Sequence, residues 1–247
     1  MSNDRLAVLK TYKLFIGGSF PRTESGRTLP VVDSKGELLA HLCHGSRKDL
    51  RNSVVAARKA QKSWAARAAY NRGQILYRMA EMLEGKRSEF IDAIAATCDG
   101  GVRRATKEVD AAIDCLVNFA GWADKYSQVV GCNNPVAGAF YNFTSPEPMG
   151  VVGVIAPNEQ PLLGLVAMLA PVIVSGNTAV VLGSEQHPLA TSIFAEVCAT
   201  SDVPGGVINL LTSKRNELLE HFANHRDLNG VAAAGCSTKQ RTVLELG

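Results

Sequence analysis

The chain has 247 residues, of which 46% are hydrophobic, and a formal net charge of +3. This length and apolar content can bury a substantial core, in one large domain or in one domain with an appendage. The small net charge excludes the strong global field that a nucleic-acid-binding protein would use, so we expect no nucleic-acid partner.

Six cysteines lie far apart in the sequence and form no CxxC or metal-binding pair. This spacing predicts reduced, mostly buried thiols in a cytoplasmic protein, with no metal site and no disulfide framework. Met1–Lys10 has no apolar core of signal-peptide length, and the apolar run Leu162–Val174 is shorter than the roughly 20 residues that span a bilayer. We therefore expect no membrane segment.

The first half of the chain predicts a small β appendage followed by helices. Thr28–Val32 and Glu37–Leu42 flank a polar turn and predict a hairpin. Ser46, with Asp49 three residues later, is close to a capping box and predicts the start of a helix. Apolar residues at helical spacing predict further helices over Asn71–Leu83, Ser88–Thr97 and Ala105–Val129.

Lysine and arginine are frequent between Arg47 and Lys107. We interpret these residues as the solvated faces of helices, where the aliphatic stems cover apolar surface. An RNA- or phosphate-binding face is the alternative, but it lacks a recognition motif and interleaved exposed aromatic residues.

The stretch Met149–Glu185 reads as strand, loop, helix, turn and strand. Val151–Ile155 and Thr178–Leu182 are short apolar runs rich in β-branched residues, as expected of strands buried on both faces. Leu162–Val174 between them is apolar enough for a buried helix, and Gly176 gives it a C-terminal stop. The stretch therefore predicts one βαβ unit with parallel strands.

The same alternation continues towards the C-terminus, with helices at Pro188–Thr200 and Ser213–Asn224 and strands at Gly206–Leu211 and Gly230–Ala234. We predict an α/β fold: a doubly wound parallel (Rossmann-like) sheet with N-terminal helices and a small β appendage. Residues 1–147 would form the hairpin, the helices and an oligomerisation-type strand, with alternation over Ala139–Thr144. Residues 148–247 would form the sheet domain.

Thr242–Leu246 is predicted as a fifth strand, but only the seven residues Gly235–Arg241 separate it from Gly230–Ala234. A parallel crossover needs about 10–12 residues or more and normally contains a helix. The last strand would therefore pair differently or extend to a partner subunit.

Open parallel sheets bind ligands at the carboxyl ends of their strands. The loops Pro157–Gln160 and Gly183–Glu185 directly follow two predicted strands, so they form the candidate site.

The segments APNEQPLL, APVIVSGNTAVVLGSEQHPLA, VPGGVIN and the final LELG resemble the cofactor segment of the aldehyde dehydrogenase family, in the family's order. The resemblance covers nearly the whole chain and about the first half of a full-length member. It implies a Rossmann-like fold and NAD bound over the strand ends. It also implies a helix between the last two strands, which we expect to be deleted here.

The resemblance implies catalysis by a cysteine thiolate, an asparagine with a backbone N–H group, and a glutamate base. The nucleophile of the family lies beyond LELG, and none of the six cysteines here matches its position. The asparagine position holds Glu159, so Asn158 could serve only after a one-residue shift. Glu245 matches the base. The candidate catalytic residues are thus Asn158 and Glu245.

The cofactor-binding residues that the resemblance implies are Ala156, Pro157, Asn158, Ser184, Glu185, Gly235 and Cys236. Several positions depart from the family pattern. Leu182 replaces a lysine that meets the adenosine ribose, Gly183 replaces a proline, and Asp202 replaces a glycine near the adenine. Lys239 and Gln240 stand where a second glycine of the phosphate loop belongs. We therefore expect weak binding of NAD or NADP.

Two functions follow from these patterns. The first is a non-catalytic aldehyde dehydrogenase-like protein that acts as a scaffold or partner subunit. The second is an NAD(P)-dependent aldehyde oxidoreductase completed by another chain that supplies the cysteine. In both cases we expect a homo-oligomer or a complex with an aldehyde dehydrogenase-like chain, because a face left uncovered usually forms an interface.

Overall fold

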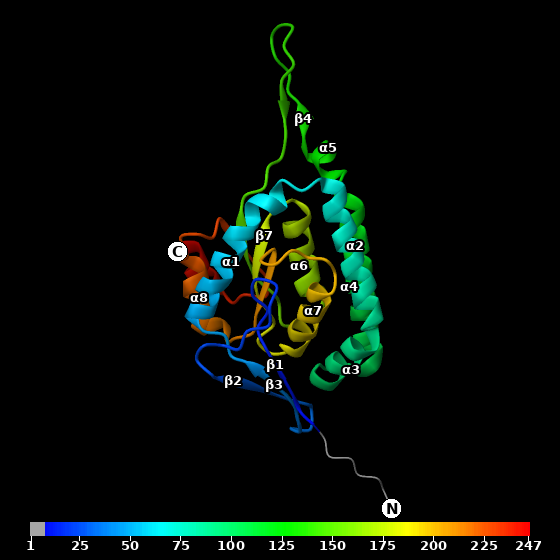
Figure 1. Ribbon diagram of the computed structural model, residues 1–247, viewed down its shortest axis with the longest axis vertical. Helices are drawn as coiled ribbons and strands as arrows, with labels where there is room; N and C mark the ends of the chain where they lie inside the picture. The colour runs from blue at the N-terminus through cyan, green and yellow to red at the C-terminus, as the bar shows by residue number, and fades with distance from the viewer. Residues whose placement is uncertain (1–7) are drawn as a thin grey trace, which may run out of the picture.

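The computed structural model describes residues 8–247 and is built around a parallel β-sheet (Figure 1). Its strands are β6 (Val151–Ile155), β7 (Thr178–Leu182), β8 (Ile208–Leu211) and β9 (Gly230–Ala233). Their spatial order is β8–β7–β6–β9, and all neighbours pair in parallel. The first three strands are buried along their whole length. This burial fits the apolar, β-branched sequences of β6 and β7, whereas in β8 the buried Asn209 donates to the carbonyls of Ala179 and Gly206.

The direction of winding reverses at β6. The chain moves outward from β6 to β7 and β8 through α6 (Leu163–Val174) and α7 (Leu189–Ala199), then returns past β6 to β9 through α8 (Arg215–Ala223). The crevice between β6 and β9 is therefore the topological switch point of a doubly wound sheet. The predicted α/β, Rossmann-like sheet is confirmed.

Helices cover both faces of the sheet (Figure 1). α1 (Arg47–Ala65) and α8 pack on one face, and α6 and α7 pack on the other. α2 (Ala69–Gly85) and α4 (Gly101–Trp122) lie outside α6, with α3 (Arg87–Thr97) against α4. Within residues 8–247, no helix combines the length and the apolar composition needed to cross a bilayer.

α1 begins at the predicted capping box. Ser46 Oγ accepts the backbone N–H of Asp49 at 3.3 Å, and Asp49 Oδ2 accepts the backbone N–H of Ser46 at 2.8 Å. The Oδ2 atom also accepts a hydrogen bond from Thr23 Oγ1 at 2.7 Å. The buried Asp49 carboxylate therefore joins the N-terminal segment to α1.

A three-stranded sheet precedes α1. β2 (Thr28–Val32) and β3 (Leu38–Cys43) form the predicted antiparallel hairpin, and β1 (Lys10–Tyr12) pairs with β3 in parallel. Phe15 and Leu210 exchange two backbone hydrogen bonds of 3.1 and 2.7 Å. These bonds join the appendage to β8.

A second hairpin extends away from the rest of the molecule (Figure 1). Here β4 (Cys132–Asn133) pairs with β5 (Phe143–Thr144) after the short helix α5 (Tyr126–Val130). The predicted strand over residues 139–144 is thus shorter than expected. The predicted helix over residues 105–129 is interrupted after Trp122, where the last turn tightens and Ala123 donates to the carbonyl of residue 120.

One hydrophobic core joins the N-terminal helices to the sheet. Trp64 is 1% exposed and donates from Nε1 to the carbonyl of Ile173 at 2.9 Å. Arg72 Nε donates to the carbonyl of Val174 at 2.9 Å. Side chains of this core from both halves of the chain include Leu76, Met79, Val109, Val152, Val154 and Leu165. The division into residues 1–147 and 148–247 stays a prediction.

The C-terminal segment corrects one prediction. Thr238–Leu246 forms a helix, α9, and not a fifth strand. Ser237 Oγ accepts the N–H of Gln240 at 3.3 Å, and the Gln240 side chain accepts the N–H of Ser237 at 3.0 Å, which makes a capping box. The expectation that the helix after β9 is deleted is also wrong, because α9 follows β9 after a short turn. Because the segment is a helix that packs on α8, the seven residues Gly235–Arg241 do not have to form a crossover to a fifth strand.

Candidate functional site

The carboxyl ends of the four parallel strands meet at one edge of the sheet. The loops that follow them begin at Ala156 after β6, Gly183 after β7, Thr212 after β8 and Ala234 after β9. Open α/β sheets bind ligands at this edge. The loops contain every predicted cofactor-binding residue: Ala156, Pro157, Asn158, Ser184, Glu185, Gly235 and Cys236.

Asn158 connects two of these loops through its side-chain oxygen. Asn158 Oδ1 accepts hydrogen bonds from Ser184 Oγ and from the backbone N–H of Glu185, both at 3.1 Å. Ser184 is 1% exposed, and its hydroxyl oxygen also accepts the N–H of His187 at 3.0 Å. The amide oxygen is therefore used inside the protein, and the NH2 group is the part of Asn158 that can donate to a ligand.

The Glu185 carboxylate accepts a hydrogen bond at the start of α8. Its Oε2 atom accepts the backbone N–H of Arg215 at 3.0 Å. The first N–H groups of a helix have no intrahelical partner, and a carboxylate there is also favoured by the helix dipole. Glu185 thus satisfies a structural requirement of α8, although its side chain is exposed.

Arg215 lies across the switch point, between the loops after β6 and β9. Its Nη1 atom donates to the carbonyl of Gly235 at 2.8 Å, and its Nη2 atom donates to the carbonyl of Ala156. The side chain is among the most deeply buried large side chains, with 2% of the residue exposed. No sequence pattern indicated this position, because an arginine at the start of a helix is ordinarily solvated.

The turn after β9 contains Gly235 and Cys236. Gly235 has a φ of +60°, which favours glycine, and a Cβ atom there would lie 3.4 Å from Glu159 Oε2. Cys236 is half-buried, and its thiol donates to the carbonyl of Ala234 at 3.8 Å. The thiol thus forms its hydrogen bond with a backbone carbonyl and not with a general base.

Three further thiols are held in the protonated form by their surroundings. Burial raises the pKa of the Cys98, Cys115 and Cys198 thiols above the ordinary value. Because the thiolate is the nucleophilic form of cysteine, these positions do not suit covalent catalysis.

Helix α4 supports the loop after β6 with two charged residues that the sequence did not single out. Arg104 Nη2 donates to the carbonyl of Glu159 at 2.7 Å. Glu108, 5% exposed, accepts the backbone N–H of Leu162 at 2.9 Å before the start of α6. The Glu159 carboxylate itself lies exposed beside the Gly235 turn, where it would repel an oxyanion.

The remaining predicted positions lie outside this cluster or are buried beneath it. Glu245 is exposed on α9, so it does not project from a strand end. Leu182 is fully buried in β7. Asp202 is exposed and has a φ of +58°, so its backbone keeps the geometry of the glycine that the resemblance places there.

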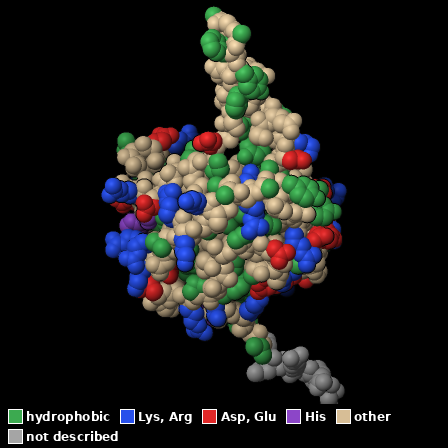
Figure 2. All heavy atoms as spheres, turned by 45° about the horizontal axis from the view of Figure 1, so that its top comes forward, with side chains coloured by type: hydrophobic (Ala, Val, Ile, Leu, Met, Phe, Trp, Pro, Cys, Tyr) green, Lys and Arg blue, Asp and Glu red, His purple; other side chains and the backbone are tan. Residues whose placement is uncertain are grey.

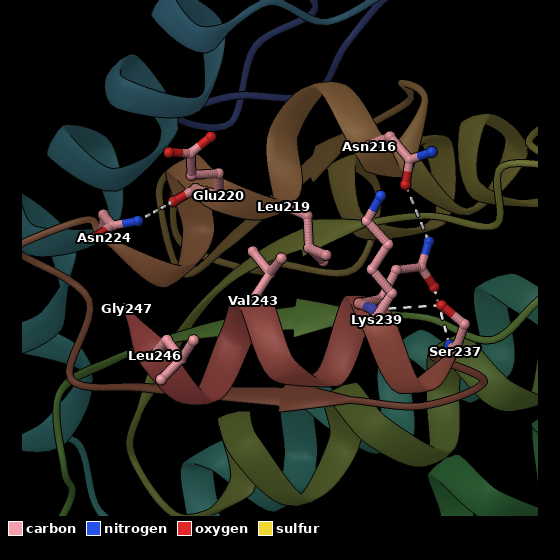
Figure 3. Close-up of a pocket in the computed structure, with 10 residues that line it drawn as sticks. Asn216, Leu219, Glu220, Asn224, Ser237, Lys239, Val243, Leu246 and Gly247 are labelled. Carbon is pink, nitrogen blue, oxygen red and sulfur yellow. Dashed lines mark hydrogen bonds between the residues drawn. The ribbon is translucent and has the colours of Figure 1, made fainter.

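A groove of about 600 Å³ runs between α8 and α9 (Figure 3). Val243 of α9 points towards Leu219 of α8, while Asn216, Lys239 and Ser237 add polar groups to its lining. Across residues 8–247, no set of three or more His, Cys, Asp or Glu side chains is placed to hold a metal ion.

Known proteins with similar sequences are aldehyde dehydrogenases. The family model described as "Aldehyde dehydrogenase family" matches residues 21–246. Mitochondrial aldehyde dehydrogenase of Rattus norvegicus is 32% identical over 95% of this chain and 48% of its own length. The putative aldehyde dehydrogenase DhaS of Bacillus subtilis (strain 168) has the same identity over the same shares of the two chains.

Solved structures have the same fold. The NAD+ complex of aldehyde dehydrogenase from Bacillus cereus has a TM-score of 0.90 and 27% identity, over 96% of this chain and 48% of that chain. The chain therefore spans about half the length of the relatives it matches. The order of motifs, the doubly wound sheet and these matches together show that the chain belongs to the aldehyde dehydrogenase family.

Proposed function

We propose that this chain is a non-catalytic member of the aldehyde dehydrogenase family that acts as a scaffold or partner subunit. The observation that carries the proposal is that acceptor groups at the strand ends are used within the protein. Asn158 Oδ1 is bonded to the loop after β7, and Glu185 Oε2 is bonded to the N–H of Arg215. A ligand that needs Asn158 Oδ1 or Glu185 Oε2 would have to replace internal hydrogen bonds, which lowers its net affinity.

The predicted catalytic groups support the same proposal. Covalent aldehyde oxidation needs a thiolate, an oxyanion donor and a general base. The Cys236 thiol is bonded to a backbone carbonyl, the Glu159 carboxylate lies where a donor is required, and Glu245 lies on α9. Asn158 offers a donor through its NH2 group, which can act on an oxyanion only beside a nucleophile.

The residues at this edge do not fit NAD or NADP in the way that the family resemblance implies. Leu182 presents a buried, apolar side chain where a lysine would meet the ribose. Glu185, the expected acceptor for ribose hydroxyl groups, has one carboxylate oxygen, Oε2, engaged at the N-terminus of α8. We therefore propose that NAD or NADP binds weakly at most.

Two exposed features support association with another chain. β9 is the outer strand of the sheet, and Val231 on it is 37% exposed. The hairpin β4–β5 carries Phe140, Tyr141 and Phe143, which are 77%, 79% and 60% exposed. Figure 2 shows hydrophobic side chains along the projection at the top of the molecule. An open strand edge and exposed aromatic side chains usually become covered. We propose a homo-oligomer or a complex with an aldehyde dehydrogenase-like chain.

The six cysteines are free thiols. Unpaired thiols persist in a reducing compartment, so we propose a cytoplasmic location.

The alternative function is an NAD(P)-dependent aldehyde oxidoreductase completed by another chain that supplies the cysteine. One observation favours it: α9 follows β9 after the short turn at residues 234–237, and its N-terminus is capped by Ser237. A helix N-terminus after a strand of a doubly wound sheet is the usual place for a phosphate group.

A steady-state assay of NAD and NADP reduction with aliphatic and aromatic aldehydes tests the proposal. The purified chain and its Cys236→Ser variant should both give no aldehyde-dependent reduction above that of a sample without protein. Turnover that Cys236→Ser abolishes would show an active enzyme and contradict the proposal. Turnover that appears only after a second aldehyde dehydrogenase-like chain is added would support the alternative.

A further inference from the structure

We propose that Arg215 fills the crevice at the switch point and excludes the dinucleotide from it. This inference deepens the proposed function, on which it rests, by naming the side chain that closes the site. In an open α/β sheet the ligand lies in the crevice where the winding reverses. In this chain that crevice lies between β6 and β9, and the Arg215 guanidinium spans it.

The guanidinium bridges two loops through hydrogen bonds. Its Nη1 and Nη2 atoms donate to the carbonyls of Gly235 and Ala156, which follow β9 and β6. Ala156 is fully buried and Arg215 is 2% exposed, so protein atoms occupy this volume. The planar guanidinium presents its donors in a rigid fork, which suits a bridge between two fixed acceptors.

Hydrogen bonds fix Arg215 at both its backbone and its guanidinium. Arg215 is the first residue of α8, and its backbone N–H is fixed by Glu185 Oε2 at 3.0 Å. Gly235, at the other end, turns the chain with a φ of +60° and aims its carbonyl back at the guanidinium. The side chain therefore cannot leave the crevice without breaking hydrogen bonds in two loops.

The charge of Arg215 raises the opposite possibility, that the residue receives an anion. Its Nε atom is buried without a hydrogen-bond partner in the part of the chain that the structure describes. However, Arg215 is 2% exposed and its Nη1 and Nη2 atoms are held by the carbonyls of Gly235 and Ala156, so an anion at Nε would have to displace buried protein atoms. The contacts therefore favour exclusion of the dinucleotide over its capture.

Calorimetric titration with NAD, without aldehyde, tests the exclusion. Arg215→Ala removes the bridge between the loops, and Arg215→Gln keeps a polar side chain that can form a hydrogen bond with only one of them. Lys214→Ala is the matched control, because it removes a positive charge from the adjacent, exposed residue. Circular dichroism and thermal unfolding establish which variants fold, so that Arg215→Gln answers the question if Arg215→Ala does not fold.

We expect both Arg215 variants to bind NAD at least about tenfold more tightly than the unmodified chain, and Lys214→Ala to bind as the unmodified chain does. Equal or weaker binding by a folded Arg215 variant would overturn the proposal, because the side chain would then be neutral or a ligand-binding residue. Micromolar binding by the unmodified chain would overturn it directly. None of these outcomes measures turnover, so failure of the exclusion is distinct from failure of the proposed non-catalytic function.

Discussion

His44 is buried, with 6% of the residue exposed, and its Nε2 atom lies 3.3 Å from Glu217 Oε1. Burial lowers the pKa of this imidazole, against the opposing effect of Glu217, while Arg27 and Lys214 lower it further. His187 behaves in the same way, since burial and Arg104 lower its pKa. Both side chains are therefore more readily protonated in the unfolded chain than in the folded one.

We predict that the free energy of unfolding falls as the pH is lowered from about 7.5 to about 5. The folded pKa of each histidine lies below the unfolded pKa, so stability is complete above the unfolded value and is lost as the pH falls towards the folded value. Urea denaturation at a series of pH values measures this slope. His44→Asn should reduce the slope, and His44→Asn with His187→Asn should reduce it again. A slope unchanged in the double variant would contradict the prediction.

At the residue scale, the sequence predicted which residues lie at the strand ends but not their hydrogen-bond partners. The loops were predictable because parallel strands end at one edge. The internal partners of Asn158 and Glu185 were not, since they depend on how two loops approach each other in space. Arg215 was missed for the same reason, and so were Arg104 and Glu108, which reach the site from α4.

At the scale of single elements, the Ser46 cap makes a direct prediction. Ser46→Ala removes the acceptor for the N–H of Asp49 and should lower the free energy of unfolding by about 1 kcal/mol. Ser88→Ala is the matched control, because Ser88 lies exposed in the first turn of α3. Urea denaturation of the three proteins measures the difference. Equal stability of the Ser46→Ala variant and the unmodified chain would show that the cap does not stabilise α1.

The elements themselves were largely predictable from local patterns. Strands β6 and β7 read as short apolar runs because both of their faces are buried, and β2 and β3 flank a polar turn. The strand β8 was predicted from the continuing alternation of strands and helices. The prediction of a strand at 242–246 is wrong, because this segment continues a helix that begins at Thr238. Ser237 and Gln240 form a capping box, which is a helix-start pattern that the sequence does contain.

At the scale of the whole molecule, the distal hairpin β4–β5 makes the clearest prediction. A variant with Phe140→Ser, Tyr141→Ser and Phe143→Ser should sediment as a smaller species than the unmodified chain, because these exposed side chains would bury apolar area in an oligomer. Its melting temperature should change little at low protein concentration, since these side chains lie outside the core.

The matched control for the hairpin changes two exposed aromatic residues elsewhere. Tyr70→Ser with Tyr77→Ser alters α2, where these side chains are 66% and 52% exposed. This variant should keep the sedimentation coefficient of the unmodified chain. A monomeric unmodified chain, or a hairpin variant that keeps its oligomeric state, would contradict association through the hairpin.

The central claim is that Asn158, Glu185 and Arg215 form hydrogen bonds within the protein at the strand ends, so that this edge binds NAD weakly at most. Calorimetric titration of the unmodified chain with NAD tests this claim most directly. The account predicts no saturation at millimolar NAD. Saturation at micromolar NAD would show that the edge still binds the cofactor and would contradict the account.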